Sequence, residues 1–488
     1  MTTDVSKLFF RRKFSTNFYK NKRLVLGGMS FAKDFVTDKR GDLYPLVKST
    51  GEFSEKAGGG EYSFSSDGGA AARLIGSHFP YESYRIKADI ENGECGVLIM
   101  TEKAELRVTF KVLDGKIVIC SENGGIHTDC CYHAGMSFIV SCRPGAFDVY
   151  FEDDGHIRYA GTLHSKDFSG IDSEKLYKSS TASLYVSGCA RVCQVEAFID
   201  CGVSQADVRP VRYENGDILV ENGRAYITMS VRLEAGYYQG VFSWIPGTEE
   251  FELVGVLFFD AGDGVCCNDV ASSVVFDRND RLWKVWYCSF AHGHVLGFAQ
   301  SAGDVRFGLN VLDCTLMEKM EKQSSDRDFL GKEGDEDPDF LYDEKSGKWY
   351  LTVCRLVSCE NGANYRYFLF ESEKSFCDGF SYVTNALDGS ETGGSIVKVG
   401  GGYNFVCGSD YEKRAQYHVY KLPDLKNYDK LKCDFDDGGF RGWGTVMPIV
   451  CGTRKRYFWL TFDRHNASEY NWSYGNLYLY EADEYEKI

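Results

Sequence analysis

The sequence predicts an all-β protein of two domains, an N-terminal β-sandwich followed by a five-bladed β-propeller. Apolar and polar residues alternate with a period of two through many short runs, which is the pattern of half-buried strands. Asn-Gly, Asp-Gly and Gly-rich turns separate these runs, and a hairpin of constant layout recurs through the second half of the chain. At 488 residues the chain is long enough for two or three domains that each bury a core.

The recurring hairpin is clearest at Gly334 to Leu351, GDEDPDFLYDEKSGKWYL. Acidic residues enter a short apolar strand there, a turn follows, and an aromatic strand returns. Successive hairpins start 52 to 68 residues apart, which is the size of a four-stranded blade, so five blades are expected between Asp207 and Ile488. The other four hairpins are predicted at Asp217 to Ser230, Asn268 to Trp286, Glu391 to Gly408 and Arg441 to Phe462.

The first part of the chain reads as an antiparallel sandwich, assigned to residues 24–203, and the propeller is assigned to residues 204–488. Residues 1–23 are basic and lack a long apolar run, so they are expected to form an arm on an acidic body rather than a signal peptide. Alternating runs are predicted at 84–90, 96–101, 106–112, 116–121, 137–141, 146–151, 156–163, 182–186 and 192–198.

Composition narrows the class of partner. The net charge of −16 argues against a nucleic-acid partner and against an anionic membrane surface. No run reaches the roughly 20 apolar residues that a membrane helix needs. Many of the 18 cysteines lie inside apolar runs and none has the paired spacing of a zinc site, which favours a reducing, cytoplasmic location.

Acidic residues head most of the predicted inner strands. In a propeller these strand ends converge on a central channel, and buried carboxylates are costly without partners, so the acidic channel mouth is predicted to be the active site. Blade one offers three acids, Asp207, Glu214 and Asp217. The distance to the returning aromatic favours Glu214 as the partner of Glu391, whereas Asp207 ranks first and Asp217 second as the acid entering the first strand.

The second half resembles the five-bladed propeller glycosidases, notably glycoside hydrolase family 43 and the related families 32, 68 and 130. The resemblance lies in Asp337-Pro338 before an apolar strand, and in Glu391-Thr392-Gly393-Gly394, where family 43 commonly shows Glu-Gly-Pro. The blade-one Asp-Pro of the family is absent, as are the Asn-Asp-Pro-Asn and Arg-Asp-Pro motifs of the fructan enzymes. The resemblance therefore does not identify the sugar on which the protein would act.

The resemblance implies a glycoside hydrolase that acts on a small oligosaccharide or glycoside. Glu391 would be the general acid, its proton retained by neighbouring negative charges, and Asp207 or Asp217 would be the base or nucleophile. Asp337 would orient the sugar and tune the acid, with Asp269 and Asp339 as walls. Further substrate-binding candidates are His292, Arg355, Arg441, Trp443, Asp463 and Trp472.

Two alternatives accompany this interpretation. A phosphorylase would use a cationic pocket, for which Arg327, Lys332, Arg355 and Arg441 are candidates. A non-catalytic glycan-binding propeller would need the aromatic platforms without the acids. The first domain resembles the lectin-like jelly rolls of the concanavalin and laminin-G type, which implies a glycan-binding module or a stabilising appendage. No cofactor is expected to be required, although a structural divalent ion on the channel axis is compatible with the acids.

Overall fold

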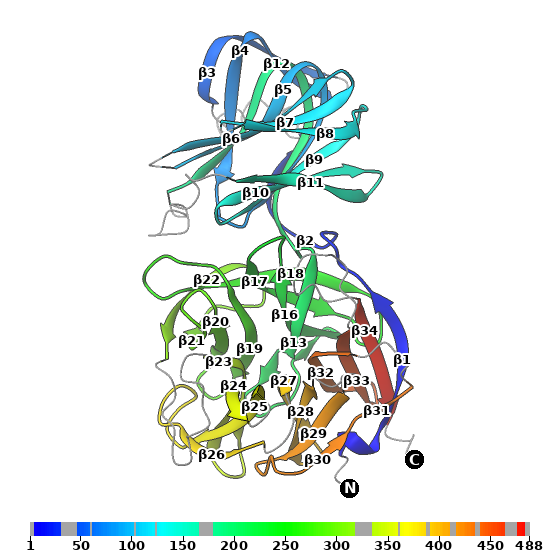
Figure 1. Cartoon of the computed structure of the whole chain (residues 1–488), viewed down its shortest axis with the longest axis vertical. Coiled ribbons are helices and arrows are strands. Elements are labelled where there is room, and N and C mark those ends of the chain that lie inside the picture. The colour runs from blue at the N-terminus through cyan, green and yellow to red at the C-terminus, as the bar shows by residue number, and fades with distance from the viewer. Residues whose placement is uncertain are drawn as a thin grey trace. The chain divides into compact units, whose positions relative to one another are not determined.

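The computed structural model describes residues 4–30, 46–58, 61–101, 104–122, 124–164, 179–317, 334–359, 362–386, 391–409, 416–434, 440–463 and 476–483. The chain divides into two compact parts. The first part is Arg23–Asp200 with Asp263–Val265, and the second is Met1–Lys22, Cys201–Gly262 and Cys266–Ile488. Both are built from strands, so the predicted all-β class is confirmed (Figure 1). No helix among the described residues is long and apolar enough to span a bilayer.

The first part is one eleven-stranded sheet with the order β11-β10-β9-β5-β12-β4-β3, in which β2 also pairs with β12 and β6, β7 and β8 extend from β5. Its strands are β2 (Arg23–Ser30), β3 (Leu46–Gly58), β4 (Glu61–Ser77), β5 (Ser83–Met100), β6 (Glu105–Leu113), β7 (Lys116–Ser121), β8 (Gly124–Cys131), β9 (Ser137–Arg143), β10 (Ala146–Asp153), β11 (His156–His164) and β12 (Thr181–Asp200).

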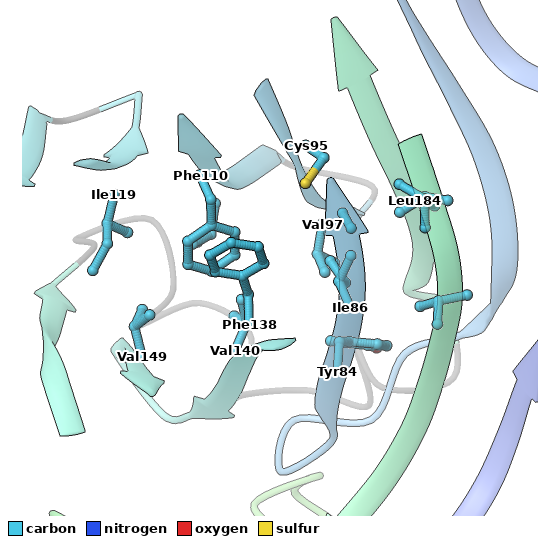
Figure 2. Close-up of a cluster of buried hydrophobic side chains, with 14 of the residues drawn as sticks. Tyr84, Ile86, Cys95, Val97, Phe110, Ile119, Phe138, Val140, Val149 and Leu184 are labelled. Atoms are coloured by element: carbon cyan, nitrogen blue, oxygen red, sulfur yellow. The ribbon is translucent and has the colours of Figure 1, made fainter. Parts of the chain in front are cut away.

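Two long strands let this sheet enclose its own core. β5 pairs with β9 near its start and with β6 near its end, and β12 runs beside both halves of β5 with two register shifts. Each therefore contains two of the runs predicted as separate strands. The strands that pair with the two ends of β5 meet in this core: Phe110 of β6 and Phe138 of β9 stack with ring centroids 4.5 Å apart (Figure 2). The specific jelly-roll topology stays a prediction.

The second part contains five successive groups of four strands, which we call modules I to V. Each group is antiparallel and begins with an inner strand, β13, β19, β23, β27 or β32. Each inner strand contacts the next, and β32 contacts β13, so the ring closes (Figure 1). This is the arrangement of a β-propeller. Modules I and II also share a parallel edge between β18 and β22.

The strands of the modules are as follows. Module I has β13 (Ser204–Pro210), β16 (Arg224–Arg232), β17 (Tyr237–Trp244) and β18 (Phe251–Asp260); module II has β19 (Asp269–Asp277), β20 (Leu282–Ser289), β21 (Val295–Ser301) and β22 (Gly308–Leu316); module III has β23 (Asp335–Asp343), β24 (Lys348–Cys359), β25 (Gly362–Ser372) and β26 (Ser381–Asn385); module IV has β27 (Glu391–Val399), β28 (Gly402–Ser409), β29 (Gln416–Leu422) and β30 (Tyr428–Lys430); module V has β32 (Phe440–Cys451), β33 (Arg454–Asp463), β34 (Leu477–Asp483) and β1. Short elements are η1 (Val5–Lys7), β14 (Arg212–Tyr213), β15 (Val220–Glu221) and β31 (Lys432–Cys433).

The N-terminal segment is a strand of the ring rather than a loose arm. β1 (Phe9–Thr16) pairs antiparallel with β34, so the outermost strand of the last module comes from the start of the chain. Phe10 is fully buried and meets Trp459 edge to face, with ring centroids 5.9 Å apart. The two ends of the sequence therefore close one sheet.

Module I differs from its predicted hairpin. The sequence predicts Asp217 to Ser230 as the first inner hairpin, but the inner strand is β13 and the residues of β16 form the second strand. Between them the chain adds β14, which pairs parallel with the end of β19. The Asn-Gly turn and the apolar run of β16 do form a hairpin, between β15 and β16. However, β16 is the second strand of the module, counted from the inner strand β13.

Candidate active site

One backbone feature repeats on all five inner strands. Each loses register with its neighbour at a β-bulge, between Ala206 and Arg209 in module I and at the corresponding places in modules II to V. The bulge residues of the first four modules are Asp207, Ala271, Asp337 and Gly393, with φ of 54°, 53°, 48° and 61°.

The bulge explains why two acids stand in equivalent places. A left-handed residue lets the strand bend and re-aims its side chain, and Asp tolerates this conformation better than most residues. Asp207 and Asp337 occupy the same position in modules I and III and are each only 6% exposed. Two residues earlier, the same alignment places Gln205, Asp269, Asp335 and Glu391 at the strand starts.

Two buried thiols lie among these acids: Cys288 Sγ donates to the Asp335 carbonyl at 3.6 Å, and Cys354 Sγ donates to the Glu391 carbonyl at 3.2 Å. Burial raises the pKa of Cys288 well above its usual value, and the charges of Glu336, Asp337, Asp269 and Asp207 raise it further. The pKa of Cys354 is raised in the same way by burial, and then by Asp337, Glu336, Cys407 and Glu391. Both thiols therefore stay protonated, and the carboxylates around them converge from modules I to IV.

The pKa of the Asp207 carboxyl is raised toward neutral pH. Burial raises its pKa from 3.8 to about 6, the charge of Asp337 adds to this, and Arg232, a hydrogen bond from Ser230 and Arg209 oppose it. A group that titrates there is ionised at neutral pH yet can accept a proton during a reaction.

Asp337 and Glu391 are tied together through the backbone of β27. Asp337 Oδ2 accepts a hydrogen bond from the Gly393 N–H at 2.9 Å, two residues after Glu391. Glu391 is fully buried; its Oε1 accepts from the Tyr420 hydroxyl and lies 2.7 Å from His418 Nδ1. Its Oε2 has no hydrogen-bond partner among the described residues. One oxygen of the carboxyl is thus held by hydrogen bonds, and the other is buried without a hydrogen-bond partner among the described residues.

Asp339, a predicted wall residue, and Arg355, a predicted substrate-binding residue, both bind other groups of the ring. Asp339 is fully buried and accepts from Arg212, from Ser273 Oγ at 2.6 Å and from the Ile396 N–H at 2.6 Å. Arg355 binds Asp335, with Nη2 to Oδ2 at 2.8 Å. Both residues therefore make contacts within the ring, and their roles toward a sugar stay predictions.

Asp217 lies away from the cluster. It is exposed and pairs with Lys398 at 2.9 Å, near the far end of β27. Seven residues separate Lys398 from Glu391, so Asp217 lies roughly 20 Å from the acids by the rise of a strand. Glu214 is buried at that end, where it binds Arg278. Of the three blade-one acids, Asp207 is the one beside Asp337.

The remaining predicted residues have varied positions. Asp269 is buried at the start of β19, and His292 accepts or donates to Ser289 Oγ at 2.8 Å in the turn after β20. Trp443 is buried on β32. Arg441 and Asp463 lie on β32 and β33, but their side chains are outside the described part, as is the whole of Trp472.

Three groups at the site, His418, Tyr420 and Arg209, were missed from the sequence, whereas His294 was considered beside His292 as a candidate for a sugar subsite. His418 and Tyr420 contact Glu391 from β29. They are two residues apart and lie on the same face of the strand, a spacing that alone is only a weak indication of a site. His294 pairs with Glu336 at 3.1 Å across modules II and III. Arg209 follows Asp207 by two residues and is fully buried.

Within the described ranges no group of three or more His, Cys, Asp or Glu side chains is arranged to hold a metal ion. The divalent ion considered from the sequence therefore stays a prediction.

The chain matches no family model, and no curated protein matches its sequence. Solved structures with a similar fold include Bacillus subtilis levansucrase, at 14% identity over 58% of this chain and 86% of that chain, with a TM-score of 0.40. The catalytic domain of the Coprinopsis cinerea GH62 alpha-L-arabinofuranosidase matches at 12% identity over 57% and 90%, TM-score 0.38. Inulosucrase from Halalkalicoccus jeotgali bound to kestose matches at 13% over 53% and 76%, TM-score 0.40. At this similarity the function rests on the geometry of the site itself.

Proposed function

We propose that the protein is a glycoside hydrolase whose active site is the acid cluster of the five-module ring. One observation carries the proposal: Asp207 and Asp337 occupy the same left-handed bulge position in modules I and III, and Glu391 starts the next inner strand. Placing several carboxylates together in a buried site is costly, and glycosidic cleavage is a reaction that needs such groups.

The roles follow from what each carboxyl contacts. Glu391 donates a proton to the leaving oxygen; one of its oxygens is held by Tyr420 and His418, and the other has no hydrogen-bond partner among the described residues. Asp207 takes the proton from the attacking water, which bonds to the anomeric carbon, or attacks that carbon directly. Asp337 is held by the Gly393 N–H and orients the sugar.

The substrate class is a small, uncharged oligosaccharide or glycoside. Several carboxylates crowd the site, and this favours neutral hydroxyl groups over a second anion. The same reasoning favours water over phosphate as the acceptor, because Arg355, one of the cations suggested for a phosphate pocket, is bound by Asp335. Of the other candidates for that pocket, Arg327 and Lys332 lie outside the described residues, as does the side chain of Arg441. A cytoplasmic location and a sugar-binding role for the first part remain predictions.

The test is a screen of chromogenic furanosides and pyranosides on the wild type, Asp207→Asn and Asp217→Asn, each with and without phosphate. Loss of turnover in Asp207→Asn with retention in Asp217→Asn supports the assignment of the first acid. The opposite pattern would move the site to the far end of the ring. Turnover that requires phosphate would favour a phosphorylase, and sugar binding without turnover a binding protein.

A further inference from the structure

The Glu391 carboxyl is held by two side chains of β29, the third strand of module IV. Its Oε1 accepts a hydrogen bond from the Tyr420 hydroxyl and lies 2.7 Å from His418 Nδ1. The side chains of His418 and Glu391 are both fully buried. The His418 ring also stacks on Tyr428, with centroids 3.8 Å and planes 18° apart. Packing on one side and the carboxyl on the other therefore fix the orientation of the imidazole.

Tyr420 is a hydrogen-bond donor in this arrangement. Burial raises the pKa of its hydroxyl well above the usual value, and the charges of Cys407 and Glu391 raise it further. The hydroxyl keeps its proton and donates it to Oε1. Oε1 is thus an acceptor before His418 is considered.

The burial of His418 favours one of its two tautomers. A neutral imidazole carries its proton on one nitrogen, and the other nitrogen is an acceptor. With the proton on Nδ1, the ring donates to Glu391 Oε1. With the proton on Nε2, Oε1 would have to carry a proton of its own, and the Nε2–H would lack an acceptor, because Nε2 has no hydrogen-bond partner among the described residues. Buried N–H groups without an acceptor are rare in proteins.

We propose that His418 is a positioning residue for Glu391: it donates from Nδ1 to Oε1, beside Tyr420, and so confines the proton of the carboxylic acid to Oε2. This inference rests on the proposed function for its consequence in catalysis. During cleavage the Oε2–H bond breaks and the proton forms an O–H bond with the leaving oxygen. The carboxylate that results keeps both donors on Oε1, which stabilise its charge.

Two thiols complete the surroundings of this carboxyl. Burial raises the pKa of Cys407 well above its usual value, and the charge of Glu391 and a hydrogen bond to it raise it further. Cys354 donates to the Glu391 carbonyl at 3.2 Å, and burial raises its pKa well above the usual value as well. Both thiols and the Tyr420 hydroxyl stay protonated, so none of the three adds a titration near neutral pH.

The first test determines the tautomer of His418 without any turnover. Long-range ¹H–¹⁵N NMR spectra of protein labelled with ¹⁵N at its nine histidines show which ring nitrogens carry a proton. The His418 signals are those lost in His418→Asn. A protonated Nδ1 at neutral pH, in a neutral or a charged ring, is the expected result. A bare Nδ1 beside a protonated Nε2 would overturn the proposal.

The second test compares His418→Leu, which removes the donor, with His418→Asn, whose amide can place an N–H near the position of Nδ1. His418→Leu is expected to lose about 10-fold or more in kcat with little change in KM, because hydrogen bonds to charged groups are among the strong ones. The basic limb of its kcat/KM profile should move to higher pH, because the ionised carboxylate has lost a donor. His418→Asn should keep most of kcat and the wild-type limb, and equal losses in the two variants would overturn the proposal.

His78→Leu is the matched control. His78 is another buried histidine, in the first part of the chain, and its Nδ1 lies 2.7 Å from the Tyr84 hydroxyl. This variant is expected to leave kcat and its pH profile unchanged, and a loss equal to that of His418→Leu would count against a specific role of His418. Circular dichroism checks the folding of each variant, and the tautomer of the wild type decides the question if His418→Leu does not fold.

The two tests separate this inference from the proposed function. If no glycoside is turned over, the proposed function fails, and the NMR measurement still decides where the His418 proton lies. If turnover is lost in Glu391→Gln but unchanged in folded His418→Leu, the proposed function stands and this inference is wrong.

Discussion

Arg212 donates a hydrogen bond to the carboxylate of Asp339, and both side chains are buried inside the ring. The same guanidinium reaches Ser273 Oγ at 3.2 Å and the Ile396 carbonyl at 2.6 Å. One arginine from module I therefore binds modules II, III and IV. Asp339 and Arg212 together therefore help to join the modules.

Arg212→Met is expected to lower the free energy of unfolding by about 3–5 kcal/mol, because it leaves Asp339 buried and uncompensated. The double variant Arg212→Met/Asp339→Asn is expected to recover part of that loss. Urea unfolding followed by tryptophan fluorescence measures both. Lys116→Met, which removes an exposed pair with Asp129, serves as the control and should not move the midpoint. Equal destabilisation of the single and double variants would contradict a charge-based role.

Asp207 makes the stability of the protein depend on pH. Its raised pKa keeps a proton on the folded chain where the unfolded chain has already lost it, so stability falls as the pH rises from about 4 to about 6 and the cost is constant above that. A shift of this size corresponds to at most about 3 kcal/mol. Asp207→Asn should therefore be more stable than the wild type at pH 8 and nearly equal to it at about pH 3.5. A gain of the same size at both pH values would show that the titration of Asp207 is not its cause.

Ala271 stores strain in module II. It has φ of 53° at the bulge where its equivalents are Asp207, Asp337 and Gly393. A left-handed alanine costs about 1–2 kcal/mol, and a glycine loses about 0.5–1 kcal/mol in backbone entropy. Ala271→Gly should consequently raise the thermal midpoint slightly, while Gly393→Ala should lower it. Differential scanning calorimetry measures both, and a loss in each variant would argue against strain at the bulge.

The N-terminal strand contributes to the closure of the ring. Phe10→Ala removes a fully buried ring from Trp459 and should cost about 3–5 kcal/mol, as large-to-small core changes do. Arg11→Ala, the exposed neighbour on the same strand, should cost less than about 0.5 kcal/mol. Equal unfolding midpoints for the two variants would mean that β1 does not hold module V.

Sequence patterns predict the strands better than their partners. The inner strands of modules II to IV begin at Asp269, Asp335 and Glu391, close to the predicted acidic heads, because an acid before an apolar run is a local signal. The pairing of β1 with β34 joins opposite ends of the chain, and no local pattern reports such a contact. In module I the sequence ranks Asp207 first as the acid of the first strand, but the stronger alternating pattern of β16 places the predicted inner hairpin one strand too far out.

The sequence predicts which acidic residues form the candidate site better than it predicts how they are arranged. Asp207, Asp337 and Glu391 stand out in the sequence by their charge and their position before apolar runs. In the structure Asp207 and Asp337 occupy equivalent bulges, and Asp337 accepts a hydrogen bond from β27 two residues after Glu391. The bulge that aligns Asp207 with Asp337 depends on the register between neighbouring strands, which a single sequence does not reveal. The contacts of His418 and Tyr420 with Glu391 depend on the packing of β29 near β27 and are hidden for that reason.

The most direct measurement of the central claim is turnover of chromogenic glycosides by the wild type, Glu391→Gln and Asp337→Asn, with circular dichroism to confirm that each variant is folded. Glutamine cannot donate the proton that the leaving oxygen needs, so Glu391→Gln should lose turnover by about 10²-fold or more. Asp337→Asn should lose turnover as well, through weaker orientation of the sugar. Activity retained in both folded variants would contradict an active site at this cluster.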